Sequence, residues 1–134
     1  IIILSRNMKK IIKTKNAPEA IGPYNQAVSV NGLLFTAGQI GINPSTGILV
    51  EGGVEKEIDR VMSNLDSILD SEGLDKAHIV KLTVYVTDLS NFDVVNNAFK
   101  KYFGDVAFPA RSTVEVSALP LGALVEVDCI AFLS

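Results

Sequence analysis

Two helical segments interrupt a chain whose other regular segments alternate between apolar and polar residues. Segment 54–72 has helical spacing, with one apolar stripe formed by Val54, Ile58, Val61, Met62, Leu65, Ile68 and Leu69. Segment 90–103 repeats this spacing with Phe92, Val95, Phe99, Tyr102 and Phe103. Ser90 and Asp93 predict a capping box at its start, and Gly73 predicts a left-handed end to the first helix. Two helices can cover only one face of a sheet.

The strands are predicted from alternation. Segment 79–86 directs Val80, Leu82, Val84 and Val86 to one side and Lys81, Thr83 and Tyr85 to the other. A hairpin is predicted over 26–37, because Asn31-Gly32 separates two apolar runs and both turn positions require positive φ. Further strands are expected at 11–14, 111–117 and 124–133. Segment 38–53 contains five glycines and is expected to be mostly turns.

One sheet face remains uncovered in this arrangement. We expect Arg111, Thr113, Glu126 and Asp128 to lie on it, beside the bulky side chains of Leu124, Ile130 and Phe132. A face that mixes charges with large apolar groups is poorly suited to open water and well suited to a wet interface between subunits. The alternation therefore predicts self-association.

Length and charge narrow the possible functions. A chain of 134 residues suits one domain, which we assign to 8–134. Residues 1–7 precede Met8 and are treated as an N-terminal extension or a cloning remnant. The net charge of −3 disfavours a nucleic-acid binder. The single cysteine excludes an internal disulfide and suits the reducing cytoplasm, and no apolar run approaches the length of a membrane span.

One arginine and one glutamate remain as candidates for chemistry. His78 is the only histidine and no metal-ligand spacing occurs, so no metal centre is predicted. Cys129 lies among apolar residues, which favours a structural thiol over a nucleophile. Arg111 is either a surface ion-pair residue or an anion receptor. Glu126 is either structurally paired or an acid–base group whose pKa is raised by Asp128. The pattern leaves both alternatives open.

Four motifs together resemble the Rid family, also called YjgF-type proteins. They are NAPEAIGPYNQA (16–27), FTAGQIGINPSTG (35–47), FPARSTVEV (108–116) and LVEVDCIA (124–131), and their order and spacing match over 8–134. The resemblance implies a chorismate-mutase-like α+β fold, with a mixed sheet and two helices on one face. It also implies a homotrimer whose three sheets enclose a central barrel, with one active site at each subunit interface.

The resemblance also implies an activity, the hydrolytic deamination of 2-enamine and 2-imino acids such as 2-aminoacrylate and 2-iminopropanoate, without metal or organic cofactor. By motif position, Arg111 looks like the carboxylate-binding residue and Glu126 like the water-positioning residue. Tyr24 matches the third catalytic position. The other substrate-binding positions are Gly38, Asn96 and the backbone carbonyl of Thr113. Ala37 stands where some relatives have serine, which leaves the finer substrate choice open.

Three alternative functions are considered. The same arginine pocket would serve a non-catalytic, regulatory trimer that binds 2-oxo acids. A ribonuclease or translation inhibitor is disfavoured by the net charge and by the single histidine. A chorismate mutase would rest on fold analogy alone, which does not settle function.

Overall fold

A computed structural model describes residues 8–134, so the prediction for residues 1–7 lies outside the described residues. The elements, in chain order, are β1 (Lys10–Ile12), β2 (Ala27–Val30), β3 (Leu33–Thr36), β4 (Ile42–Asn43), β5 (Ile48–Leu49), α2 (Gly53–Asp70), η1 (Lys76–His78), β6 (Ile79–Val86), η2 (Leu89–Asn91), α3 (Phe92–Phe103), β7 (Ala110–Glu115), η3 (Pro120–Gly122) and β8 (Val125–Phe132). Each η element is a short 3₁₀ turn.

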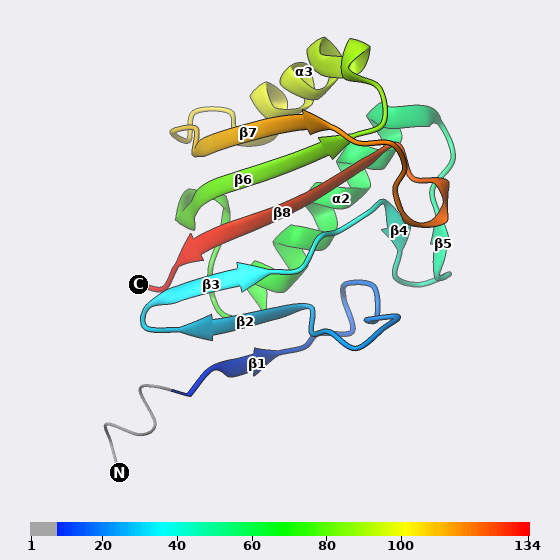
Figure 1. The fold of residues 1–134 in the computed structure, drawn as a ribbon. Helices are drawn as coiled ribbons and strands as arrows, with labels where there is room; N and C mark the ends of the chain where they lie inside the picture. Colours follow the sequence, from blue (N-terminus) through cyan, green and yellow to red (C-terminus); the bar gives the residue numbers. More distant parts are fainter. Residues whose placement is uncertain (1–7) are drawn as a thin grey trace.

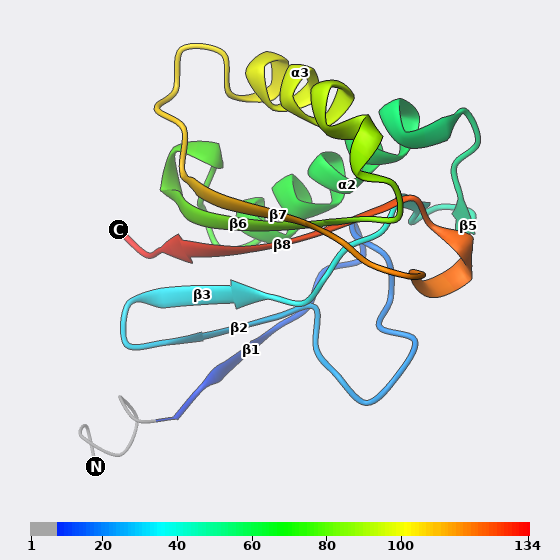
Figure 2. The same ribbon diagram turned by 45° about the horizontal axis from the view of Figure 1, so that its top comes forward.

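Six strands form one mixed sheet in the order β1-β2-β3-β8-β6-β7 (Figure 1). Four neighbouring pairs are antiparallel, and β6 and β7 are parallel with α3 between them in the chain. β4 and β5 form a separate two-stranded ribbon inside the segment expected to be mostly turns. Both helices lie on the same side of the large sheet (Figure 2). The predicted α+β arrangement of two helices on one face of a mixed sheet is therefore confirmed.

The hairpin and the first helix follow their sequence signals. Asn31 and Gly32 have φ angles of 51° and 81°, and they connect β2 to β3 as the Asn-Gly pair predicts. The predicted apolar stripe of α2 is buried along its whole length. Gly73 has a φ of 72° just after the helix, which confirms the expected left-handed residue.

The second helix begins differently from the prediction. The chain first makes the 3₁₀ turn η2, in which Asp88 rather than Ser90 acts as the cap: its carboxylate accepts a hydrogen bond from the Ser90 N–H at 2.9 Å. Asn91 precedes α3 without a side-chain cap, so the predicted capping box is wrong. Phe92, predicted to be buried, is 40% exposed because it lies in the first turn, at the edge of the packed stripe.

β6 shows why strict alternation failed at one position. A register shift between Ile79 and Lys81 places Ile79 in the core and leaves Val80 41% exposed, contrary to the predicted direction of Val80. A bulge of this kind inserts one residue and reverses the side to which the preceding residues point. From Leu82 to Val86 the predicted alternation holds.

The core lies between the helices and the covered face of the sheet. Its fully buried members include Leu34, Ile58, Val61, Leu65, Leu82, Val84, Val125 and Val127. The opposite face carries no helix of the described chain (Figure 2). By strand register, its apolar part consists of Ile11, Val28, Val30, Leu33, Phe35, Ile130 and Phe132, which we call the apolar sheet patch. Leu124, expected on this face, instead packs against the core.

Candidate active site

Arg111 lies on the edge strand β7 and is held from the side of α3. Its Nη2 donates a hydrogen bond to Oδ1 of Asn96 at 2.6 Å. Its guanidinium carbon lies 5.5 Å from the ring centre of Phe92 and 5.3 Å from that of Phe99, both on α3. Partial burial lowers the pKa of Arg111. Only one donor is used by Asn96, so the guanidinium keeps donors for a second acceptor such as a carboxylate.

Thr113 follows two residues later on the same strand. Val116 donates its N–H to the Val86 carbonyl at 2.8 Å, which fixes the direction of the backbone groups along β7. Because these groups alternate along a strand, the carbonyl of Thr113 points away from β6, towards the free edge of the sheet. The side-chain Oγ1 of Thr113 is buried without a hydrogen-bond partner among residues 8–134. Arg111, Asn96 and Thr113 together are called the carboxylate half-site.

Glu126 lies on the central strand β8, opposite Tyr85 of β6. Its carboxylate packs directly against the backbone of Gly38: a Cβ at that position would be 2.6 Å from Oε2 of Glu126. Burial, and then the negative charge of Asp128, raise the pKa of Glu126. Burial also raises the pKa of Asp128, partly offset by Tyr85 and Lys81. Glu126 and Gly38 together are called the acid half-site.

The loop that carries Gly38 is fixed to β8 and to α2. Gln39 exchanges two backbone hydrogen bonds with Val127, of 2.9 and 3.1 Å. Asn64 of α2 is fully buried and donates to the carbonyl oxygens of Ile40 and Ile42 at 3.3 and 3.0 Å. These contacts hold Gly38 beside Glu126.

Glu57 fixes the chain just before β8. This buried residue of α2 accepts the N–H of Leu124 at 2.8 Å. Glu57 and Asn64 are seven residues apart in a helix, which places them on one face, the same face that carries the apolar stripe. Neither residue was predicted as an anchor from the sequence, although this spacing was available as a signal.

Tyr24 lies on the loop before β2 and is 46% exposed. Its hydroxyl accepts the N–H of Ile21 at 3.3 Å, and no hydrogen bond within residues 8–134 joins it to Arg111 or Glu126. The loop is anchored by buried Gln26, whose side chain bonds four backbone groups of segment 14–18. Ala37 donates its backbone N–H to the Gln26 carbonyl at 2.9 Å. The loop is thus held firmly while Tyr24 remains open to solvent.

The two half-sites lie on opposite faces of the sheet. Arg111 and Thr113 pair with Leu82 and Val84, which are buried beneath the helices. Glu126 pairs with Tyr85, on the face without helices. The expectation that Arg111 and Thr113 share a face with Glu126 and Asp128 is therefore wrong. Alternation within a strand gives the relative directions of its own side chains, but the register between strands decides which face they join.

A cavity of about 330 Å³ adjoins the carboxylate half-site. Its apolar walls are Leu82, Phe99, Phe103, Phe108 and Pro109. Arg111 and Asn96 contribute polar groups to it, and Lys100 completes the lining. The same two polar residues thus belong to both the half-site and the cavity.

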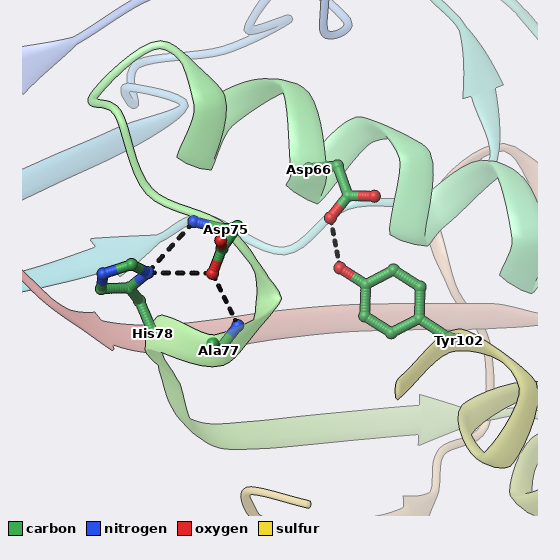
Figure 3. A network of polar contacts seen from close by, with 5 residues as sticks. All are labelled: Asp66, Asp75, Ala77, His78 and Tyr102. Carbon is green, nitrogen blue, oxygen red and sulfur yellow. Dashed lines mark hydrogen bonds and ion pairs between the residues drawn. The ribbon is translucent and has the colours of Figure 1, made fainter. Parts of the chain in front are cut away.

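The surroundings of His78 and Cys129 indicate structural roles for both residues. The Nδ1 of His78 accepts the N–H of Asp75 at 3.2 Å, while the Asp75 carboxylate accepts the N–H of Ala77 at 2.9 Å, a capping box around η1 (Figure 3). Cys129 is buried, and burial raises the pKa of its thiol to about 12. Residues 8–134 contain no group of three or more His, Cys, Asp or Glu side chains that could hold a metal ion.

The helices are further linked by a polar contact away from both half-sites. The Tyr102 hydroxyl of α3 donates to the Asp66 carboxylate of α2 (Figure 3). Burial raises the pKa of the Tyr102 hydroxyl and of the Asp66 carboxyl. The ammonium group of Lys76 donates a hydrogen bond to the backbone carbonyl of Tyr102 at 2.6 Å.

In the described part of the chain, no helix is long and apolar enough to cross a membrane.

Comparison with known proteins extends over nearly the whole chain. A family model described as endoribonuclease L-PSP matches residues 14–133. A RutC family protein of Aquifex aeolicus is 52% identical over 121 residues, covering 90% of this chain and 96% of the relative. The 2-iminobutanoate/2-iminopropanoate deaminase of Bos taurus is 44% identical over 128 residues, covering 96% and 93%.

Solved structures share the fold. YyfA of Yersinia pestis, from the conserved Rid protein family, superposes with a TM-score of 0.91 at 53% identity, over 93% of this chain and 99% of that one. The YjgF gene product of E. coli superposes with a TM-score of 0.88 at 41% identity, over 93% and 99%.

Proposed function

The chain belongs to the Rid (YjgF-type) family, and from this membership we propose that it hydrolyses reactive 2-imino acids to 2-oxo acids and ammonia. The substrates would form by tautomerisation of 2-enamines such as 2-aminoacrylate. The observation that carries the proposal is the pair of half-sites: an arginine with free donors at a strand edge, and a partly buried glutamate with a raised pKa. The deaminase name of the bovine relative supports it.

The carboxylate half-site would bind and orient the substrate. The planar fork of Arg111 matches a carboxylate, and Asn96 with the two phenylalanine rings fixes the fork in place. The outward carbonyl of Thr113 would accept a hydrogen bond from the iminium nitrogen. Such positioning holds the C=N carbon in one orientation for attack.

The acid half-site would supply the proton chemistry. Ionised Glu126 would orient a water molecule against the C=N carbon and take its proton as the C–O bond forms. The protonated carboxyl would then return this proton to the amino group of the carbinolamine. Ammonia would leave as the C–N bond breaks, while the hydroxyl oxygen gives its own proton to Glu126 and forms the C=O bond of the 2-oxo acid. A raised pKa brings the acid and base forms of Glu126 closer in population near neutral pH, which suits both steps.

Because the half-sites face opposite sides of one sheet, we propose that a complete site forms between two subunits. A homotrimer would place Arg111 of one subunit opposite Glu126 of the next. The apolar sheet patch is exposed at four of its side chains, and the outer edge of β7 pairs with no strand among residues 8–134. Both features support this assembly, since both would gain by contact with another copy. Tyr24, on its anchored but exposed loop, would reach the site from the subunit interface.

The direct test measures ammonia release from freshly generated 2-iminopropanoate and 2-iminobutanoate. We expect a rate above spontaneous hydrolysis that is proportional to protein concentration. Binding of pyruvate without any rate increase would replace the enzyme by a non-catalytic 2-oxo-acid-binding protein. Sedimentation at micromolar concentration would give a trimer, and a stable monomer would exclude the shared site.

Mixing variant subunits tests the division of the site. Arg111→Ala and Glu126→Gln proteins are each expected to be nearly inactive. If they are unfolded together and refolded at equal amounts, about a quarter of the interfaces would pair an intact Arg111 with an intact Glu126, because neighbours contribute different residues to each contact. Recovery of about that fraction of activity supports the shared site. No recovery, with trimers formed, contradicts it.

The ribonuclease suggested by the family description is a weaker candidate. The net charge of −3 gives little attraction to phosphates, and the only histidine is engaged in the η1 capping box. RNA cleavage that disappears with Arg111→Lys would support the ribonuclease function.

We propose the cytoplasm as the compartment, where the free, buried thiol of Cys129 would remain reduced.

A further inference from the structure

The cavity beside Arg111 is larger than the smallest imino acids need. It measures about 330 Å³, at the lower end of the range of about 300–1,000 Å³ typical of small-molecule sites. The methyl group of 2-iminopropanoate would fill little of this space. The cavity is therefore unexplained by a substrate whose side chain is one carbon long.

We propose that this cavity receives the substrate side chain and that the preferred substrates are 2-imino acids with large apolar side chains, such as those formed from leucine or methionine. This inference rests on the deaminase function proposed above and names its substrate class. It makes Phe108 a specificity-determining residue.

The charged group that would bind the carboxylate lies directly beside the apolar surface of the cavity. Phe99 contacts the Arg111 guanidinium and also forms part of the cavity wall. Arg111 itself also lines the cavity, so the carboxylate site and the apolar space adjoin directly. In a 2-imino acid the carboxylate and the side chain are attached to the same reacting carbon, so a molecule held by Arg111 can extend its side chain into the cavity.

The walls of the cavity are mainly apolar. Five apolar side chains surround the space, three of them phenylalanines. The only charged group besides Arg111 is Lys100, whose side chain is exposed. Apolar walls favour a side chain that would otherwise contact water, and they disfavour a second carboxylate or an amide that would lose its hydrogen bonds.

Phe108 is the wall residue that can act without supporting the core. It is 63% exposed, and its ring meets that of Phe103 edge-on at 5.9 Å. It lies in the connection between α3 and β7, three residues before Arg111. A substrate side chain in the cavity would cover the exposed ring, so both would leave water together.

Calorimetry with 2-oxo acids, the products, tests the cavity without turnover. The series is pyruvate, 2-oxobutanoate, 2-oxopentanoate and 4-methyl-2-oxopentanoate, with 2-oxoglutarate as the charged comparison. We expect affinity to rise by up to about fourfold for each added methylene group that enters apolar contact. Equal affinities across the series, or tightest binding of 2-oxoglutarate, would overturn the inference.

Variants connect the selectivity to Phe108. The ratio of kcat/KM for the leucine-derived imine to that for the alanine-derived imine should fall roughly tenfold in Phe108→Ala, the size of effect expected for one pocket contact. Phe108→Leu should keep most of this ratio, because it restores an apolar side chain. Ile48→Ala removes a similarly exposed apolar side chain from β5 and should leave the ratio unchanged. An unchanged ratio in Phe108→Ala contradicts the assignment.

The outcomes separate the two proposals. If no imine is hydrolysed but affinity for 2-oxo acids still rises with side-chain length, the deaminase function fails and the apolar subsite stands. If small imines are hydrolysed and neither affinity nor kcat/KM rises with side-chain length, the deaminase function stands and the subsite fails.

Discussion

The carboxylate of Glu126 occupies the space where Gly38 lacks a side chain. A Cβ on Gly38 would lie 2.6 Å from Oε2 of Glu126, and the backbone of Gly38 does not have a positive φ. Alanine is therefore compatible with the local backbone, and the side chain that must move is the flexible end of Glu126. The close approach of these two residues fixes where the proposed base lies.

Gly38→Ala should accordingly displace Glu126 and leave the fold intact. We expect turnover to fall on the order of 100-fold, as a displacement of about 1 Å can cause. Affinity for pyruvate should be retained, since Arg111 belongs to the other half-site. Wild-type turnover in a folded Gly38→Ala protein would show that Glu126 does not act from this position.

Asp128 should shift the pH dependence of catalysis. Burial is the larger cause of the raised pKa of Glu126, and the charge of Asp128 is the second. Asp128→Asn removes that charge, so the pKa of Glu126 falls and the acidic limb of the kcat/KM profile moves to lower pH. Asp70→Asn makes the same change in net charge at the exposed end of α2 and should not move the limb. An unmoved limb in Asp128→Asn would contradict the coupling.

The same substitution has a consequence for stability. The folded pKa of Asp128 is raised, so its contribution to stability is largest at low pH, where it is protonated, and declines as pH rises through that pKa. Asp128→Asn should therefore stabilise the fold more at neutral pH than near pH 4. Urea unfolding at both pH values measures the difference. A larger gain at the acidic pH would reverse the sign and contradict the raised pKa.

Most of the fold could be predicted from local patterns, because those patterns depend on neighbouring residues. The Asn31-Gly32 turn and the stripe of α2 are set by positive φ and by helical spacing. Val80 was assigned to the wrong side because a bulge depends on pairing with β8. Phe92 was expected in the core because spacing alone does not show where the packed stripe ends.

The candidate site residues could be named from the sequence, but their arrangement could not be predicted. Arg111 and Glu126 were distinguished by their residue types and motif positions, which the sequence contains. Their placement on opposite faces depends on the register of β7 and β8 against β6, a long-range property that alternation does not encode. The buried anchor Asn64 was not singled out, because the stripe of α2 was assigned from apolar residues alone.

Cys129 should be unreactive in the folded protein. Its thiol is buried and has a pKa of about 12, so little thiolate is present and access is blocked. Iodoacetamide at mildly alkaline pH should label it only after unfolding in urea. Cys129→Ala should keep most of the activity and lower the unfolding free energy by about 1 kcal/mol through the small void it leaves. Rapid labelling of the native protein would contradict the structural role.

Thr113→Val should leave catalysis nearly unchanged, since the proposed role belongs to the backbone carbonyl. The variant also removes a buried Oγ1 that has no partner within residues 8–134, so the unfolding free energy should rise by about 1 kcal/mol. Thermal or urea unfolding beside the ammonia-release assay tests both parts. A fall in rate of about a hundredfold would be the effect of a lost proton-transfer group and would assign a role to the hydroxyl.

Arg111 and Glu126 should fail in different ways. Lysine cannot reproduce the two parallel donors of arginine, so Arg111→Lys should weaken binding of 2-oxo acid products as well as turnover. The loss for a charge-assisted pair in a partly desolvated site is on the order of 2–5 kcal/mol. Glu126→Gln keeps the shape and loses the base, so product binding should survive while turnover falls.

Calorimetry with pyruvate or 2-oxobutanoate, run beside the ammonia-release assay on both variants, separates the two roles. Normal binding of the oxo acid by Arg111→Lys would remove the carboxylate assignment. Wild-type turnover by Glu126→Gln would move the water to another group, and Tyr24 is then the candidate to substitute, because its hydroxyl lies on the exposed loop proposed to reach the site. Tyr24→Phe in the Glu126→Gln background should in that case abolish the remaining rate.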